Sequence, residues 1–248
     1  MRLVALIVLA AMVVGAVVTA AFGSDDSGRP GVKIEWIPDV AVGSTAIMTS
    51  TPTETPEPQP AENVTGFVFP IEDGCLPDDD NLMPGAPREY RGGTHEGVDI
   101  YDSDNCAYVG LDTEVVAMKA GTVVRADWEY VGLTAATLAE IEEVIAESGG
   151  SPEVDDTFRG RQVWIEHEDG TLTRYAHLED IAEDLEVGST VAQGEHIGYV
   201  GDSGTPESVT EPDTQVHLHF EIRIGESYLG AGLGADASRA LYQAAFSP

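Results

Sequence analysis

Two histidines stand one residue apart in a stretch that otherwise reads as a β-strand, VHLHFEI at residues 216–222. Because side chains on a strand alternate between its two faces, His217 and His219 are expected to project on the same side, with Glu221 beside them. Two imidazoles on one face indicate a metal site or an acid–base site. A solvent-facing polar face that happens to contain histidine would explain the pair taken alone.

A second pattern, GGTHEGVDIY, places His95 and Asp99 four residues apart around Gly97. If the chain turns at the glycine and then extends, an imidazole and a carboxylate can converge on one cation. This spacing alone is weak evidence for a metal site. Together with the histidine pair it completes a set of two histidines and one carboxylate, which suits zinc and leaves a fourth position for water.

Other residues near these patterns can be interpreted in two ways. His177, in RYAHLED, follows a predicted strand and by itself could be a capped loop histidine. His167 and His196 fall in predicted hairpins and are interpreted as structural or surface residues. Arg88 and Arg91 closely precede the first candidate ligand, where they either meet the carboxylates of a substrate or are simply solvated.

The order of these motifs resembles a known family. His-x-x-x-Asp, then Tyr-Ala-His-Leu, then VGSTVAQGEHIGYVGDSG, then His-Leu-His-Phe-Glu is similar to the lysostaphin-type (LytM-like) zinc endopeptidases, metallopeptidase family 23. Members of that family cut peptide bonds in bacterial peptidoglycan. The resemblance covers roughly residues 66 to 225, and the combined motifs are specific.

The resemblance implies roles for five residues. His95, Asp99 and His219 would bind one Zn²⁺ ion per chain, while His217 and His177 would stand beside the metal without binding it. We expect His217 to act as general base and His177 to stabilise the transition state, although the sequence also allows exchanged roles. The implied reaction is attack of zinc-bound water on an amide in peptidoglycan stem or cross-bridge peptides.

The alternative function is a catalytically inactive module of the same fold that binds peptidoglycan or regulates another hydrolase. Such relatives typically lack ligands, whereas all five positions are present here, which favours the enzyme. The sequence departs from the family pattern in a long acidic loop at 205–216 and in an insertion at about 133–160. Both segments can border the substrate groove, so they leave open whether the loop occludes it and which bond is cleaved.

The predicted fold is mainly β, an antiparallel sheet core of the lysostaphin-type peptidase kind, related to duplicated-hybrid-motif barrels. Short β-branched runs separated by glycine turns indicate the strands, and Glu168-Asp169-Gly170 indicates a hairpin. The insertion carries Leu138, Ile141, Val144 and Ile145 at helical spacing. A short C-terminal helix is expected over DASRALYQAAF, with Asp236 as N-cap and Leu241, Ala245 and Tyr242 facing inward.

The N-terminal quarter predicts export. Residues 1–22 form an apolar stretch after Arg2 that is either a cleaved signal peptide or an uncleaved membrane anchor. Residues 23–65, rich in Pro, Thr and Glu, are expected to be a disordered linker, and residues 66–248 the zinc metallopeptidase domain. The domain is therefore expected to be extracytoplasmic, secreted or anchored through that segment, and monomeric.

Composition excludes some partners. The 44 acidic residues against 12 basic ones give a formal net charge of −32, which argues against binding nucleic acid or anionic lipid. Two cysteines, Cys75 and Cys106, can pair in an oxidising compartment or remain free. A biotinyl or lipoyl carrier with Met118-Lys119 at a hairpin tip is a weaker alternative, because it leaves the histidines unexplained.

Overall fold

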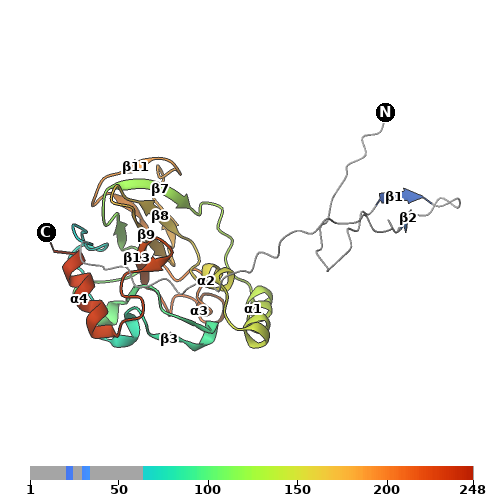
Figure 1. Cartoon of the computed structure of the whole chain (residues 1–248), viewed down its shortest axis with the longest axis horizontal. Helices are drawn as coiled ribbons and strands as arrows, with labels where there is room; N and C mark the ends of the chain where they lie inside the picture. Colours follow the sequence, from blue (N-terminus) through green and yellow to red (C-terminus); the bar gives the residue numbers. More distant parts are fainter. Residues whose placement is uncertain (1–20, 25–29, 34–63, 248) are drawn as a thin grey trace, which may run out of the picture. The chain divides into compact units, whose positions relative to one another are not determined.

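A computed structural model of the chain describes residues 21–24, 30–33 and 64–247 (Figure 1). The chain divides into two units, Met1–Thr53 and Glu54–Pro248. In the first, β1 (Ala21–Ser24) pairs with β2 (Pro30–Lys33) in an antiparallel hairpin. Residues 1–20, on which most of the predicted signal or anchor falls, lie outside the described residues, and so does most of the predicted linker. No helix in the described ranges is long and apolar enough to span a bilayer.

The second unit is built mainly from short strands. Its strands are β3 (Pro87–Arg88), β4 (Gly93–Thr94), β5 (Val98–Ile100), β6 (Glu114–Val116), β7 (Gly121–Ala126), β8 (Val163–Glu166), β9 (Thr171–Ala176), β10 (Asp180–Ile181), β11 (Thr190–Val191), β12 (His196–Tyr199), β13 (Leu218–Ile224) and β14 (Ser227–Tyr228). Its α-helices are α1 (Ala135–Ser148), α2 (Pro152–Phe158), α3 (Glu207–Thr210) and α4 (Ala235–Ala245). Three single-turn 3₁₀ helices are η1 (Asp80–Leu82), η2 (Glu89–Arg91) and η3 (Asp102–Asp104).

Two antiparallel sheets dominate this unit. The larger has the order β11-β7-β8-β9-β13-β14, with β5 also paired to β13, and the smaller has the order β10-β12-β6. The predicted hairpin is present, because β8 and β9 pair directly and Gly170 takes the positive φ of 79° that its turn requires. The predicted mainly β, antiparallel fold class is therefore confirmed.

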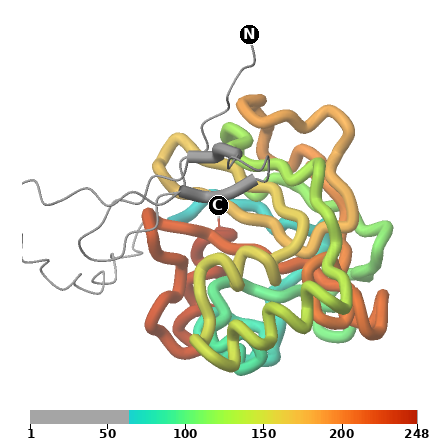
Figure 2. The backbone as a smooth tube through the Cα atoms, turned by 90° about the vertical axis from the view of Figure 1, so that its right-hand side faces the viewer, coloured from blue at the N-terminus to red at the C-terminus, as the bar shows by residue number. Residues whose placement is uncertain are grey.

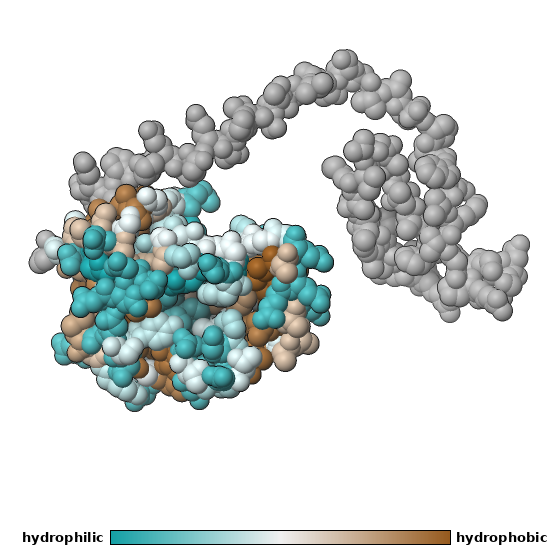
Figure 3. Space-filling model, turned by 90° about the horizontal axis from the view of Figure 1, so that it is seen from below, coloured by the Kyte–Doolittle hydropathy of each residue, from teal (hydrophilic) through white to brown (hydrophobic). Residues whose placement is uncertain are grey.

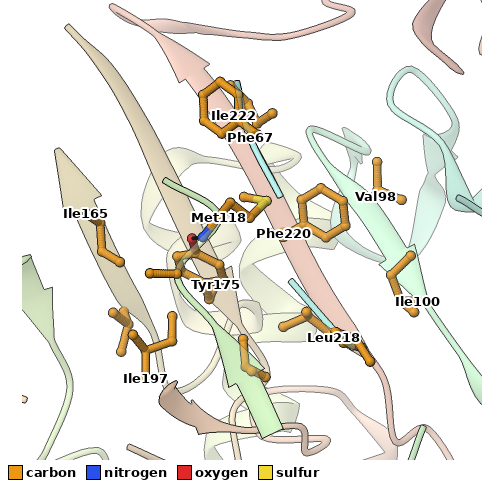
Figure 4. Packing of buried hydrophobic residues seen from close by; sticks show 14 of the residues in the cluster. Phe67, Val98, Ile100, Met118, Ile165, Tyr175, Ile197, Leu218, Phe220 and Ile222 are labelled. Atoms are coloured by element: carbon orange, nitrogen blue, oxygen red, sulfur yellow. Dashed lines mark hydrogen bonds between the residues drawn. The ribbon is translucent and has the colours of Figure 1, made fainter. Parts of the chain in front are cut away.

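Both sheets contribute side chains to one apolar core. Strand alternation sends Leu218, Phe220 and Ile222 of β13 into this core, where Ile197 of the smaller sheet also lies (Figure 4). Tyr175 of β9 is fully buried, and its hydroxyl accepts a hydrogen bond of 2.7 Å from the Met118 backbone N–H. The opposite face of β13, which carries the histidines, is consequently left for the site.

The predicted insertion is helical and consists of α1 and α2. It extends the β7–β8 hairpin, whose last pair is Ala126 and Val163. Leu138 packs inward as expected, but Val144 does not, since 48% of it is exposed. Figure 1 shows α1, α2 and α3 together on one side of the domain, with α4 on the other; Figure 2 views the insertion (yellow-green) from its own side.

The C-terminal helix α4 is also present, and Tyr242 and Ala245 are buried as predicted. Its N-cap is Gly234 rather than Asp236, so the predicted cap is wrong. The helix starts one residue earlier than the predicted segment, and Asp236 lies in its first turn, where its side chain contacts Arg239 at 3.2 Å. An acidic residue in the first turn still suits the helix dipole.

Cys75 and Cys106 form the disulfide that the sequence allowed. The Asn105 side chain spans the same junction, since it accepts from the Cys75 N–H at 3.3 Å and donates to the Cys75 carbonyl at 3.1 Å. The covalent loop closed by the disulfide contains β5 and the residues 95–99.

Hydrophilic side chains cover most of the face in Figure 3, with separate apolar spots, in keeping with the acidic composition.

We predict that replacing both cysteines by serine lowers the free energy of unfolding by about 3–4 kcal/mol, because the unfolded chain then regains the freedom of a loop of this length. Guanidinium denaturation under oxidising conditions measures this difference. A reducing agent should lower the stability of the parent protein by a similar amount and leave the Cys75→Ser/Cys106→Ser variant unchanged. Equal stability of parent and variant would contradict the prediction.

Candidate metal and catalytic site

The register between β5 and β13 brings the two sequence motifs together. Asp99 lies directly opposite His219, and Leu218 lies opposite Ile100. Directly opposed residues of an antiparallel pair point to the same face. Gly97 makes the close approach possible, because a Cβ at that position would lie 2.3 Å from the Phe220 carbonyl oxygen and 2.9 Å from the His219 ring.

Three potential ligand atoms converge on this face. His95 Nε2 lies 2.9 Å from Asp99 Oδ1 and 3.1 Å from His219 Nδ1, and His219 Nδ1 lies 2.7 Å from Asp99 Oδ1. All three side chains are buried. They are the three residues that the resemblance implied as zinc ligands, and together they form a group able to hold a metal ion.

In His95 and His219, the hydrogen bond on the side of the ring away from Asp99 shows which ring nitrogen is available to bind a metal ion. His95 Nδ1 lies 3.0 Å from the Met83 carbonyl oxygen, which can only accept, so Nδ1 carries the hydrogen and Nε2 keeps its lone pair. His219 Nε2 lies 3.2 Å from Glu221 Oε1, so in the neutral ring the lone pair is at Nδ1. Outer-shell acceptors of this kind are typical of metal-binding histidines.

The arrangement therefore requires a positive charge among the three atoms. Two imidazole lone pairs and a carboxylate oxygen at about hydrogen-bonding distance repel one another unless a cation or an additional proton lies among them. Burial lowers the pKa of His219, but its hydrogen bonds with Asp99 and Glu221 outweigh burial and raise the pKa. Nitrogen and oxygen donors in this number fit a zinc ion, which supplies the same charge.

The other two members of the group have shifted pKa values as well. Burial lowers the pKa of His95 to about 4, which keeps this ring neutral, as a metal ligand must be. Burial alone raises the pKa of Asp99, but His95 and His219 hold it well below its usual range. The Arg88 guanidinium donates to Asp99 Oδ2 at 2.8 Å and leaves Oδ1 facing the histidines.

His177 and His217 stand beside these atoms, and each uses its Nδ1 for a hydrogen bond to a backbone carbonyl. His217 Nδ1 donates to the Gln215 carbonyl at 2.7 Å, and His177 Nδ1 donates to the Ser203 carbonyl at 2.8 Å. In both neutral rings Nε2 is therefore the free acceptor. His217 Nε2 lies 3.8 Å from Asp99 Oδ1. The ring centroids of His177 and His217 are 4.4 Å apart.

The backbone at His177 is held in an unusual conformation. Its φ of 58° lies in the left-handed region, which is uncommon for a residue other than glycine. The His177 N–H donates to the Arg159 carbonyl at 2.8 Å, so the end of the insertion helps to hold this residue. Burial, together with His217 and His219, lowers the pKa of His177 well below its ordinary value, and burial also lowers the pKa of His217.

A buried ionic cluster supports the ligand His219 from the other side. Glu221 is fully buried and accepts from Arg159 at 2.7 Å, from Arg223 at 2.8 Å and from Arg174 at 3.4 Å. Burial raises the pKa of Glu221, but His219 and Arg159 outweigh it and keep the carboxylate ionised. Strand alternation had placed Glu221 beside the histidines. Arg223 lies on the same strand, but Arg159 and Arg174 come from distant segments that the sequence did not connect with Glu221.

A groove of about 660 Å³ runs over the site. Its lining includes all five predicted site residues, together with side chains of the insertion and of the acidic loop. The insertion and the loop share a separate apolar cluster, in which Leu138, Val154 and Phe158 are buried and Val209 packs against them. The segment 205–216 thus supplies a wall of the groove through Thr205, Pro206, Glu207 and Gln215.

Several weaker expectations are now decided. Arg91 is buried and bonded to Asp155 of α2 at 2.9 Å, so it is not the solvated side chain that one interpretation allowed. His167 is structural, bonded to the Ala120 carbonyl and to the Thr173 hydroxyl, each at 3.0 Å. Lys119 is partly buried and its Nζ donates to Asp169 Oδ2 at 2.6 Å and to the Thr65 carbonyl at 3.2 Å, which speaks against the carrier-domain alternative, since a carrier lysine stands free at an exposed tip.

Comparison with known proteins places this site in a family. The sequence model of Peptidase family M23 matches residues 93–230, more than half of the chain and the whole span from His95 to His219. No curated protein matches the chain.

Similar solved structures include three peptidases or candidate peptidases. A candidate glycyl-glycine endopeptidase lytM from Ruminococcus gnavus is 26% identical, with a TM-score of 0.42, 72% of this chain and 61% of that chain covered. The catalytic domain of lysostaphin from Staphylococcus simulans is 22% identical, with a TM-score of 0.37 and coverages of 62% and 85%. A zinc-containing peptidase from Vibrio cholerae is 18% identical, with a TM-score of 0.40; the match spans 68% of this chain but 39% of that protein.

We predict that Gly97→Ala disrupts the site without touching a ligand. The added methyl group must displace the Phe220 backbone or the His219 ring, so we expect a loss of stability of about 1–3 kcal/mol and weaker zinc binding. Thermal unfolding and competition with a chromogenic chelator measure the two effects. The control is Gly132→Ala, whose Cβ would meet nothing within 4 Å; unaltered zinc affinity in Gly97→Ala would contradict the prediction.

Proposed function

The chain belongs to peptidase family M23, and we propose that it is an exported zinc-dependent endopeptidase that hydrolyses amide bonds in peptidoglycan stem or cross-bridge peptides. One observation carries this proposal: three buried acceptor atoms, His95 Nε2, Asp99 Oδ1 and His219 Nδ1, face one another within 3.1 Å without a donor among them in the neutral rings. A site that served only to bind peptidoglycan would not need this arrangement.

In the proposed reaction these three residues hold the metal. Bound zinc polarises a carbonyl group and makes a water molecule more acidic. Met83 and Glu221 keep the two ligand rings in the tautomers that present their lone pairs, and Arg88 keeps one oxygen of Asp99 turned to the ion. The net charge of the ligand set is thereby confined to a single carboxylate.

His217 is proposed as the general base. Its free Nε2 is close to the ligand group, and its Nδ1–H is tied to the Gln215 carbonyl, so Nε2 can accept a proton from the attacking water. The water oxygen then forms a bond to the carbonyl carbon. The C–N bond breaks, the departing nitrogen takes the proton from His217, and the products are an amine and a carboxylic acid, which then releases its proton to solvent.

His177 is proposed to stabilise the negative charge on the former carbonyl oxygen. Because its Nδ1–H is already bound to Ser203, it can do so only with a proton on Nε2. Burial disfavours that protonated ring in the free protein. The negative charge that develops in the transition state would offset this cost by favouring a proton, taken up from solvent, on His177 Nε2.

We predict one zinc ion per purified chain and loss of peptidoglycan hydrolysis on chelation, with recovery when zinc is added back. His219→Ala should lose both the metal and the activity, because only two ligands remain. The control, His196→Ala, removes a histidine outside the site and should retain both. Metal analysis by mass spectrometry and mass spectrometry of the released peptides measure metal content, activity and the bond cleaved.

Two results of that experiment would contradict the proposal. A chain that holds zinc and binds peptidoglycan but releases no peptide fragments would be the inactive module of the same fold. A chain that cuts peptidoglycan equally well without zinc would retain the peptidase function but exclude the metal mechanism.

We predict that His217→Ala lowers kcat by about 10²–10⁴-fold while zinc content stays unchanged, because the proton acceptor is lost and the three ligands remain. Added imidazole should restore part of the activity to this variant. His177→Ala should also lose activity but should not respond to imidazole in the same way. If added imidazole restored activity to His177→Ala but not to His217→Ala, the two histidines would have exchanged roles.

A further inference from the structure

The His217 ring is stacked on Tyr101, which is not one of the five candidate site residues. The ring centroids of Tyr101 and His217 are 4.3 Å apart, and their planes differ by 11°. This geometry is parallel stacking, whereas the contact of His217 with His177 is tilted by 47°. The stack restrains the plane of the His217 ring, because rotation about its side-chain bond would drive the imidazole into the phenol.

A second contact closes a triangle among three residues. The Tyr101 hydroxyl donates to Gln215 Oε1 at 3.1 Å, and the Gln215 carbonyl accepts from His217 Nδ1 at 2.7 Å. The phenol is thus tied to the side chain of the same residue whose backbone binds the imidazole. The stack on Tyr101 fixes the plane of the His217 ring. Within that plane, the hydrogen bond from His217 Nδ1 to the Gln215 carbonyl fixes the direction in which Nε2 points.

The strand register explains why Tyr101 is in this place. Asp99 lies opposite His219, and Ile100 lies opposite Leu218, so the next position along brings Tyr101 level with His217. Tyr101 and Asp99 therefore lie on one face of the chain, as His217 and His219 do. Gln215 precedes His217 by two residues, near the end of the acidic loop 205–216 in which this sequence departs from the family pattern.

We propose that Tyr101 and Gln215 are positioning residues that hold His217 in the orientation needed to accept a proton. This inference rests on the proposed function and extends it to residues that contact none of the three metal ligands by hydrogen bond. It also assigns a function to the loop 205–216, since Gln215 of this loop binds the proposed general base His217. Both residues line the groove, so the restraint is applied at the site itself.

A double-mutant cycle tests the link between the two residues. Tyr101→Phe keeps the stack but removes the hydroxyl, and Gln215→Met removes the side-chain acceptor but keeps the backbone carbonyl. Each should lower kcat by about two- to tenfold, the worth of one hydrogen bond, with KM within about twofold of the parent value. The double variant should be no worse than either single one, because both changes remove the same interaction.

Loss of the stack should cost more. Tyr101→Ala should lower kcat by at least about tenfold with unchanged zinc content, since small displacements of a catalytic group have large effects on rate. The matched control is Tyr108→Ala, a tyrosine that is 66% exposed and lies outside the groove. A kcat for Tyr101→Ala within twofold of the parent would overturn the proposal, as would additive effects in the cycle or a loss confined to KM.

A measurement independent of activity separates this inference from the proposed function. Long-range ¹H–¹⁵N NMR spectra of the histidine rings should show His217 as a single Nδ1–H tautomer in the parent chain and as a mixture in Tyr101→Ala. If the parent is inactive but this change appears, the positioning role stands while the peptidase proposal fails. An unchanged His217 tautomer in a folded Tyr101→Ala would overturn the positioning role whatever the activity.

Discussion

The antiparallel register between β5 and β13 is the constraint on which the rest of the site depends. It sets Asp99 opposite His219 on the face that looks away from the core. Since the side-chain period of a strand is two, a slip of one residue would send Asp99 and His219 to opposite faces and would turn Leu218 and Phe220 out of the core. The burial of those apolar side chains therefore stabilises the same register that assembles the ligands. Gly97 permits the strands to approach where any Cβ would collide.

Burying so many polar groups in one place is costly unless each has a partner. Successive hydrogen bonds and ion pairs around the ligands supply these partners. His219 donates to Glu221, and Glu221 in turn is surrounded by arginines, of which Arg159 also contacts Glu96 at 2.6 Å. On the other side of the ligands, Arg88 neutralises Asp99. In the neutral rings the innermost atoms are acceptors only, so a cation or an additional proton is required among them. This chemistry matches the membership of the chain in peptidase family M23.

The two segments that depart from the family pattern act together in the fold. The insertion at 133–160 and the loop at 205–216 meet in one small apolar cluster that is separate from the main core. The insertion is also tied to the chain before the first ligand, because Arg91 bonds to Asp155 and Tyr90 packs edge-on against Phe158. Both segments contribute to the groove wall and both reach the histidines, the insertion through the Arg159 carbonyl and the loop through Gln215.

The sequence by itself determined the strand and helix types, the hairpin at residues 168–170, the possible disulfide and the five residues that meet in the groove. The elements follow from local periodicity and turn chemistry, which are properties of short stretches of chain, and the five residues follow from a motif order that resembles a known family. Only the tertiary structure decided which ring nitrogen faces the ligand group, that Arg91 is buried while Arg88 binds Asp99, that Gly234 caps α4, and that Tyr101 stacks on His217. Except for the cap at Gly234, each of these depends on a partner outside the local stretch of chain, such as Met83 for His95 or Asp155 for Arg91, and no local pattern encodes such a pairing. Tyr101 came nearest to being predictable, because it is two residues beyond Asp99 on the same strand face, but its partner became visible only once β5 was paired with β13.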